Sequence, residues 1–302
     1  MEHAGDEPRT LFLVDGSSYI FRAFHALPHL STSRGLPTNA VYGVTTMLLK
    51  LLRQARPEFI AVVFDTLGPT FRHDTYPDYK SHRPQLPEEL GAQFPYLYRA
   101  VEALRIAALR QPGYEADDVI ATVAARMEAR GVRTVVVTGD KDLMQTVSAM
   151  VTLWDTMRDR RVGLKEVRER FGVEPAQVAD VLGLAGDPTD NIPGVKGIGE
   201  KTATLLVKRF GSLEKVLSHA GELDRLGVRG GVKLKETLLA EADKARLSKE
   251  LATARTDVPV EFDLDAARYH GPDRERLREL CQELEFSALL RDLASIPEQI
   301  PE

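Results

Sequence analysis

Three short apolar runs, rich in β-branched and aromatic residues, stand out along the chain, and each of them ends at an aspartate. They occupy residues 10–15 (TLFLVD), 59–65 (FIAVVFD) and 132–140 (VRTVVVTGD). Runs of this length and composition predict buried β-strands. Amphipathic patterns with helical spacing follow the first run, at 40–55, and precede the third, at 116–131. This alternation predicts an α/β fold, with a mostly parallel sheet flanked by helices.

The ends of the predicted strands give the first indication of chemistry. Asp15, Asp65 and Asp140 each close one of the three runs. In an open parallel sheet, ligands bind beyond the carboxyl ends of the strands. We therefore expect the three aspartates to converge on one rim of the sheet.

The pattern changes in residues 66–95, which contain five prolines and alternate aromatic with basic residues. Such alternation suits a nucleic-acid single strand, because bases stack on rings while cations bind phosphates. An ordinary solvated loop is the alternative. The residues concerned are Phe71, Arg72, Tyr76, Tyr79, Lys80 and Arg83. Beyond about residue 163 helical patterns dominate, so we expect a core over 1–175 and a helical region over 176–302.

Composition narrows the class of protein without identifying it. The chain has 302 residues, is 43% apolar, and carries 40 basic against 45 acidic residues, so its net charge of -5 does not indicate a nucleic-acid binder. The single cysteine, Cys281, excludes an internal disulfide framework and fits a reducing compartment. The first apolar run is too short for a signal peptide or a membrane span. We expect a cytoplasmic protein with no membrane partner.

Acidic residues form a second pattern. The stretch GYEADDV at 113–119 opens a predicted helix, where the helix dipole favours negative charge, so a plain acidic helix start is one interpretation. However, GDKD and GDPTDN add further pairs near the expected rim. The whole set comprises Asp15, Asp65, Glu115, Asp117, Asp118, Asp140, Asp142, Asp187 and Asp190. So many hard oxygen donors, without Cys or His at metal-ligand spacing, favour Mg²⁺ or Mn²⁺ over zinc.

A glycine-rich turn lies in the helical part of the chain. The sequence PGVKGIGEKTA opens an amphipathic helix, and its glycines and lysines suit backbone and charge contacts with phosphates. An αα-hairpin that needs glycine only to turn is the alternative. The candidate DNA-binding residues of this stretch are Gly194, Lys196, Gly197, Gly199, Lys201 and Thr202. The form of the motif is that of a helix-hairpin-helix, at about 184–211.

In combination and order, these motifs resemble those of the 5' nuclease (flap endonuclease) family, and most closely the 5'→3' exonuclease domain of bacterial DNA polymerase I. The motifs that carry the resemblance are FLVDGSSYIFRAF, VVFD, TFRHDTYPDYKSHRP, PGYEADDVIAT, VVTGDKDLMQ and GDPTDNIPGVKGIGEKTA. The resemblance implies a PIN-like α/β nuclease core, an arch at about 66–95 for a 5' single strand, and a helix-hairpin-helix for duplex DNA.

The resemblance also implies roles for individual residues. Asp15, Asp65, Glu115 and Asp117 match the ligands of a first metal ion; Asp140, Asp142 and Asp190 match those of a second. Asp118 and Asp187 match acidic positions that act through water, and Arg22, Lys80 and Arg83 match basic positions that steer and polarise the scissile phosphate. Tyr76 lies near the position of an aromatic on which a terminal base stacks. A K⁺ ion held by backbone oxygens would involve Leu184, Ala185, Pro193, Val195 and Ile198.

The implied activity is two-metal hydrolysis of DNA at 5' flaps, nicks, gaps and 5' ends, including RNA–DNA hybrids, in replication and repair. The expected protein is a monomer associated with the nucleoid. Two other classes stay open from the residues: a non-catalytic binder of branched DNA, and a small-molecule phosphatase of the acidic-rim kind. In metal-free protein, neutralising Glu115 or Asp117 is expected to raise stability, because like charges repel.

Overall fold

The computed structural model describes residues 9–225 and 231–292; the ends of the two expected regions, 1–8 and 293–302, lie outside the described residues, as does 226–230. The centre of the fold is a six-stranded sheet in the order β3-β2-β1-β4-β5-β6. Its strands are β1 (Thr10–Asp15), β2 (Phe59–Val63), β3 (Ala107–Leu109), β4 (Arg133–Val137), β5 (Val151–Asp155) and β6 (Arg160–Val162). All neighbouring pairs are parallel except β5 with β6. The expected mostly parallel α/β core is confirmed.

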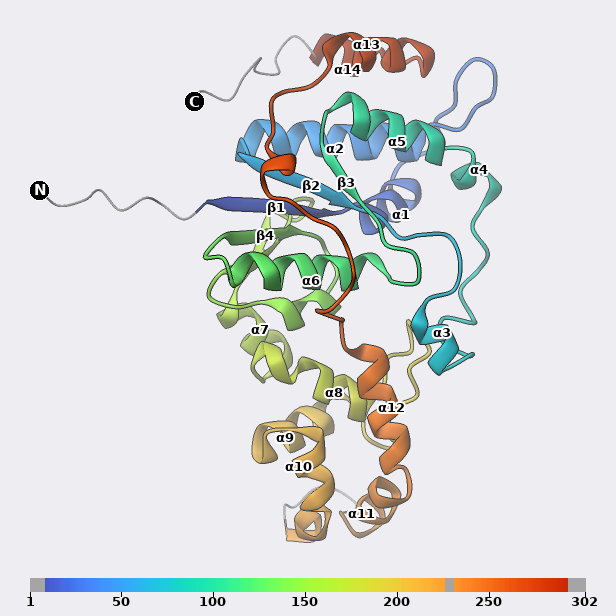
Figure 1. Cartoon of the computed structure of the whole chain (residues 1–302). Helices are drawn as coiled ribbons and strands as arrows, with labels where there is room; N and C mark the ends of the chain where they lie inside the picture. Colours follow the sequence, from blue (N-terminus) through green and yellow to red (C-terminus); the bar gives the residue numbers. More distant parts are fainter. Residues whose placement is uncertain (1–8, 226–230, 293–302) are drawn as a thin grey trace, which may run out of the picture.

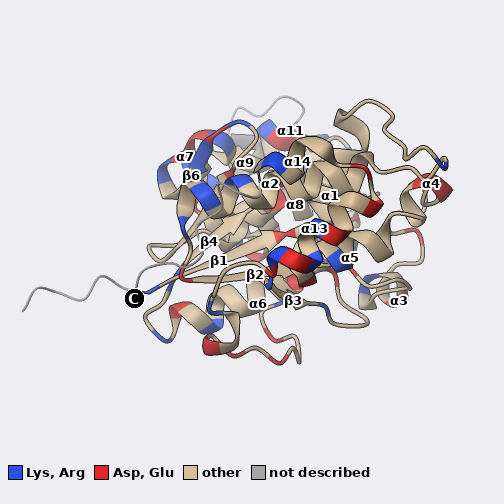
Figure 2. Cartoon of the chain, turned by 90° about the horizontal axis from the view of Figure 1, so that it is seen from above, with Lys and Arg blue, Asp and Glu red and all other residues tan. Residues whose placement is uncertain are grey.

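One face of the sheet is covered by helices from both ends of the chain (Figure 1). The helices that share this core are α1 (Gly16–Ala26), α2 (Asn39–Ala55), α5 (Phe94–Ala103), α13 (Arg274–Glu283) and α14 (Ser287–Asp292). Ion pairs between Arg99 and Glu283 and between Arg276 and Glu102 join α5 to α13 on the surface. Figure 2 shows both signs of charge side by side along α13, as such pairing requires.

The opposite face packs against α6 (Ala116–Glu128) and against the helical region. The helical region contains α8 (Val178–Ala185), α9 (Glu200–Phe210), α10 (Leu213–Ser218), α11 (Gly231–Ala240) and α12 (Ala242–Ala252), with the short 3₁₀ turn η3 (Ala220–Arg225). The elements η1 (Asp142–Thr146), α7 (Leu164–Phe171) and η2 (Pro175–Gln177) precede it or lie at its start. One continuous apolar cluster runs from the sheet into these helices. The two expected regions therefore share a core.

The last described part of the expected helical region, 176–302, returns to the sheet. After α12 the chain returns along α6, where Arg126 donates to the carbonyl oxygens of Val258 and Val260. Following the turn η4 (Asp265–Ala267), the N–H of Tyr269 donates to the carbonyl of Glu58. Helices α13 and α14 then pack on the far side of the sheet. Residues 265–292 thus belong with the α/β core.

Residues 66–95 lie outside the sheet, beside its edge (Figure 1). They contain α3 (Phe71–Thr75) and α4 (Glu88–Gly91), and residues 81–89 are all exposed. The buried Gln93 anchors the end of this segment, because its side chain accepts from the N–H groups of Ala40 and Val41 and donates to Asn39. We call residues 66–95 the arch segment. None of the described helices combines the length and the apolar character that a membrane span requires.

Candidate active site

The predicted convergence of strand ends is confirmed. Strands β1, β2 and β4 are neighbours, and the carboxylates at their ends line one cavity of about 290 Å³. Its acidic lining is Asp15, Asp65, Glu115, Asp117, Asp140, Asp142 and Asp190, and its basic lining is Arg22, Lys80, Arg83 and Lys141. Seven of the nine predicted carboxylates, and all three basic residues predicted to act on the scissile phosphate, therefore share this active-site cavity.

Asp15 forms the buried floor of the cavity. Its Oδ1 accepts from the N–H of Ser18, which caps α1, and its Oδ2 accepts from the hydroxyl of Thr138. Burial raises the pKa of Asp15 to about 7, helped by the negative charges of Asp140 and Asp65. Burial likewise raises the pKa of Asp142 to about 7. Both carboxylates are costly to ionise here without a cation.

The acidic stretch 113–119 forms the start of α6. Glu115 is the N-cap, and the backbone N–H of Ala116 donates to Oδ1 of Asp65 over 2.7 Å. Asp117 points its charge toward other carboxylates: burial raises its pKa, and Asp140 and Asp15 raise it further. The start of α6 therefore lies beside Asp65, Asp15 and Asp140, which lie at or just beyond the ends of three different strands.

The arch segment contributes cations to the same cavity. Nζ of Lys80 lies 2.6 Å from Glu115 and 3.5 Å from Asp190, and Nη2 of Arg83 lies 2.5 Å from Asp190. Burial alone would raise the pKa of Glu115, but the charges of Lys80 and Arg72 hold this pKa below its ordinary value. The Tyr79 hydroxyl donates to both Glu115 and Asp190. Hence the arch segment and the acidic rim are joined directly.

Lys141 lies between the carboxylates of Asp142 and Asp187. Nζ of Lys141 lies 2.9 Å from Asp187 and 3.7 Å from Asp142, and it keeps the pKa of the buried Asp187 low against the effect of burial. Asp187 also accepts from the N–H of Thr189. Asp187 thus lies behind the cavity lining, held by Lys141.

These residues fit hard divalent cations by donor chemistry. Every candidate ligand is a carboxylate, which suits Mg²⁺ or Mn²⁺. Oδ1 of Asp142 is buried and accepts no hydrogen bond. Burial, and to a smaller extent the charges of Asp140 and Asp65, raise the pKa of Asp15. Over residues 9–225 and 231–292, no three acidic, His or Cys side chains are already grouped closely enough to hold an ion.

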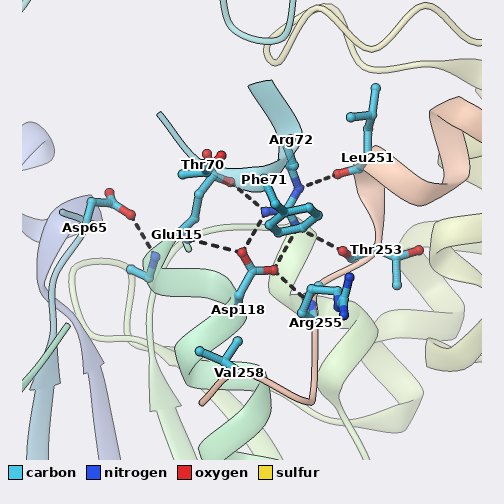
Figure 3. Close-up of polar contacts among 12 residues, drawn as sticks. Asp65, Thr70, Phe71, Arg72, Glu115, Asp118, Leu251, Thr253, Arg255 and Val258 are labelled. Carbon is cyan, nitrogen blue, oxygen red and sulfur yellow. Dashed lines mark hydrogen bonds and ion pairs between the residues drawn. The ribbon is translucent and has the colours of Figure 1, made fainter. Parts of the chain in front are cut away.

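Two predicted roles are wrong. Asp118 was expected among the metal carboxylates, but it is fully buried and its oxygens accept from Arg72, from Glu115 N–H and from Arg255 N–H. Arg72 was expected to bind DNA, but only 3% of it is exposed. Figure 3 shows the two side chains facing each other between the arch segment and α6. Neither reaches the cavity surface.

The helix-hairpin-helix is present as α8, a turn and α9, in which Lys196, Gly197, Gly199 and Lys201 are exposed. Gly194 is instead buried: a Cβ there would lie 2.3 Å from the backbone nitrogen of Gly186. The predicted contact of Gly194 with DNA is therefore wrong, and its role is the close approach of two chain segments. Thr202 and Tyr76 are half-buried.

Sequence reasoning missed three residues of the site. Tyr79 was assigned only an aromatic role, yet its hydroxyl bridges Glu115 and Asp190. Thr138 and Lys141 stand beside predicted aspartates in VVTGDKD, which was the available signal. Each touches carboxylates of the cavity or directly behind it.

Most of the chain matches the models of a known family. Residues 10–172 match the model of the 5'-3' exonuclease N-terminal resolvase-like domain, and residues 173–275 that of the 5'-3' exonuclease C-terminal SAM fold. The chain therefore belongs to the 5'-3' exonuclease family, a family of nucleases.

Individual relatives agree. The chain is 38% identical to the 5'-3' exonuclease of Aquifex aeolicus, over 95% of this chain and 96% of that protein. It is 45% identical to DNA polymerase I of Bacillus caldotenax over 95% of this chain, but it spans only 32% of that relative. Among solved structures, T5 5'-exonuclease with divalent metal ions has a TM-score of 0.65 at 21% identity, covering 95% of this chain and 99% of that one. The catalytic core of Rad2 in complex with DNA substrate also scores 0.65, at 16% identity, covering 96% and 93%.

Proposed function

We propose that this chain is a metal-dependent, structure-specific 5' nuclease that hydrolyses DNA at 5' flaps, nicks, gaps and 5' ends. The observation that carries the proposal is the cavity in which seven carboxylates face Lys80 and Arg83 from the arch segment. A binder of phosphate gains nothing from so many negative charges unless they hold cations. In replication and repair, such an activity would remove flaps and RNA primers.

The carboxylates divide into two sets. Asp15, Asp65, Glu115 and Asp117 would hold one Mg²⁺ or Mn²⁺ ion, and Asp140, Asp142 and Asp190 a second, with Asp187 acting through water. Bound ions would supply an activated water and neutralise charge on the attacking and leaving oxygens. Lys80 and Arg83 would turn from Glu115 and Asp190 to the scissile phosphate, and Arg22 would steer the strand.

The surfaces beyond the cavity suit the two parts of a branched substrate. The arch segment, with Tyr76 and its exposed residues 81–89, would hold the 5' single strand. The exposed Lys196, Gly197, Gly199 and Lys201, with Thr202, would bind the duplex backbone. Relatives of this fold are recorded with DNA substrate, as for Rad2. We propose that the protein acts on DNA as a monomer.

A potassium ion at the hairpin is a further part of the proposal. The carbonyls of Leu184, Ala185, Pro193, Val195 and Ile198 would be its ligands. A hydrogen bond from Val195 N–H to the Leu184 carbonyl holds the two segments together. Replacing K⁺ with Na⁺ should then weaken duplex binding while Mg²⁺ is kept constant.

Cleavage of a labelled 5'-flap DNA tests the function. Product is expected with Mg²⁺, and none with EDTA or with Asp140→Asn. Tight binding without cleavage in Mg²⁺ would favour a branched-DNA binder, and turnover of a phosphomonoester alone would favour a phosphatase. The affinity should also fall steeply with salt, and Lys196→Ala with Lys201→Ala should reduce the slope of log K against log salt by roughly 2.

A further inference from the structure

The guanidinium of Arg72 is saturated with hydrogen bonds in a buried position. Its Nε donates to the carbonyl of Leu251, and Nη2 donates to the carbonyl of Thr253 and to Oδ1 of Asp118. Nη1 donates to Oδ2 of Asp118 over 2.7 Å and to Glu115 over 3.3 Å. A guanidinium has five N–H donors, and all five are used here.

Asp118 is equally saturated. Besides the two bonds from Arg72, Oδ2 accepts from Glu115 N–H over 3.1 Å and Oδ1 from Arg255 N–H over 2.9 Å. A carboxylate has about four acceptor positions, so none is left for a metal ion or a water. Removing one partner would strand a buried charge, which is why such a pair is fixed in place.

This ion pair joins three segments that are far apart in sequence. Figure 3 shows Arg72 on α3 of the arch segment, Asp118 on α6, and the chain from Leu251 to Arg255 at the end of α12 meeting at one point. The ring of Phe71 lies against two guanidinium groups, 4.5 Å from that of Arg72 and 5.4 Å from that of Arg255. Helix α12 in turn packs on α8. We call α8, the turn that follows it and α9 (residues 178–210) the hairpin region.

We propose that Arg72 and Asp118 are positioning residues, a clasp that fixes Glu115 and couples the hairpin region and the arch segment to it. The proposal rests on the proposed metal role of Glu115. Glu115 is bonded to both members of the clasp: its backbone N–H donates to Oδ2 of Asp118, and its side-chain Oε2 accepts from Nη1 of Arg72. Because Arg72 also donates to the carbonyls of Leu251 and Thr253 at the end of α12, a displacement of α12 would be transmitted to Glu115 through Arg72.

Arg72→Lys tests the clasp because it keeps the charge but removes the planar fork. The single-turnover cleavage rate and the Mn²⁺ affinity by calorimetry should each fall roughly 10- to 100-fold, as for other groups that orient metal ligands. The affinity for flap DNA in EDTA should stay unchanged, because the hairpin surface is intact. In metal-free protein, amide exchange should accelerate together in residues 70–80, 113–119 and 250–257, but not in 196–208.

Arg168→Lys is the matched control. Arg168 makes a similar fork to Glu174, with bonds of 2.7 and 2.9 Å, but the pair is exposed and neither residue lines the active-site cavity. It should leave all four measurements unchanged.

The double variant Arg72→Met with Asp118→Leu separates positioning from mere stability. Replacing a buried ion pair by apolar groups often restores stability, so the melting temperature should recover relative to Arg72→Met alone. Cleavage and Mn²⁺ affinity should stay reduced, because the Glu115 N–H has lost its acceptor. Recovery of both with the melting temperature, or a folded Arg72→Lys variant with wild-type rate and affinity, would overturn the clasp. Absence of cleavage and of Mn²⁺ binding in the wild type would instead overturn the proposed function.

Discussion

Two sides of the active-site cavity balance their negative charge in different ways. On the cation-rich side, Glu115, Asp187 and Asp190 lie against Lys80, Lys141 and Arg83, and the pKa values of Glu115 and Asp187 are lowered. On the cation-poor side, no ion pair to Asp15 or Asp117 occurs among the described residues, and burial raises the pKa of both.

An added divalent ion therefore matters most on the cation-poor side. The cation-rich side is stabilised by the chain's own cations, so the fold holds its charge without metal. The cation-poor side has hydrogen bonds and burial but no positive charge, so its ionised form is costly until a divalent ion binds. The charges beside a carboxylate, rather than its place in the motif, therefore decide whether neutralising it raises or lowers the stability of the metal-free protein.

The largest effect is expected from neutralising one acid on each side. Asp117→Asn and Glu115→Gln should both slow flap cleavage by roughly 10²- to 10³-fold, because each removes a proposed metal ligand. In EDTA their stabilities should diverge. Asp117→Asn should unfold at a higher temperature than the wild type. Glu115→Gln should instead lose about 1–3 kcal/mol, because Lys80 and Arg72 each lose a negatively charged acceptor.

Denaturant unfolding in EDTA measures this divergence. The ion pairs of Glu115 with Lys80 and Arg72 contradict the reason for expecting that neutralising Glu115 raises metal-free stability, since Glu115 faces cations as well as acids. A destabilised Asp117→Asn, or a stabilised Glu115→Gln, would contradict the difference between the two sides.

The metal-free stability should depend on pH through Asp15, on the cation-poor side of the cavity. The pKa of Asp15 is about 7 in the fold against 3.8 for the free group. Because folding raises it, the stability from this carboxyl is fully present below pH of about 3.8 and is lost as the pH rises through about 7. The stabilisation by Asp15→Asn relative to the wild type should therefore grow from pH 5 to pH 8 in EDTA.

Urea unfolding at several pH values measures that difference. Adding Mg²⁺ should reduce the growth, because the ion then compensates the ionised carboxylate. A difference between Asp15→Asn and the wild type that is constant with pH in EDTA would count against a raised pKa for Asp15.

The smallest effect is expected from Lys141→Met, which removes the cation beside Asp142. Lys141 lies 3.7 Å from Asp142 and is 42% exposed, so its competition with an added ion is modest. The affinity for Mn²⁺ by calorimetry should rise about two- to fivefold. Lys165→Met, which removes a surface ion pair at the same 3.7 Å distance, should leave it unchanged.

Much of the fold followed from local patterns. The three predicted strands are β1, β2 and β4, and their length and β-branched residues were sufficient to identify them. Strands β3 and β6 have only three residues each, and β6 reads RRV, so neither carries a strand pattern of its own. Pairing with β2 and β5 determines them. The return of α13 and α14 to the sheet is likewise a matter of long-range packing, which no local pattern reports.

The sequence by itself determined which residue types are present and where strands end, and hence that Asp15, Asp65 and Asp140 share a rim, since neighbouring parallel strands end together. Only the tertiary structure decided how neighbours in GYEADDV divide. Glu115 meets Lys80, Asp117 meets other acids, and Asp118 turns inward to Arg72. The physical reason is that a carboxylate's role depends on the charges and donors within a few ångströms, and these come from residues distant in the sequence.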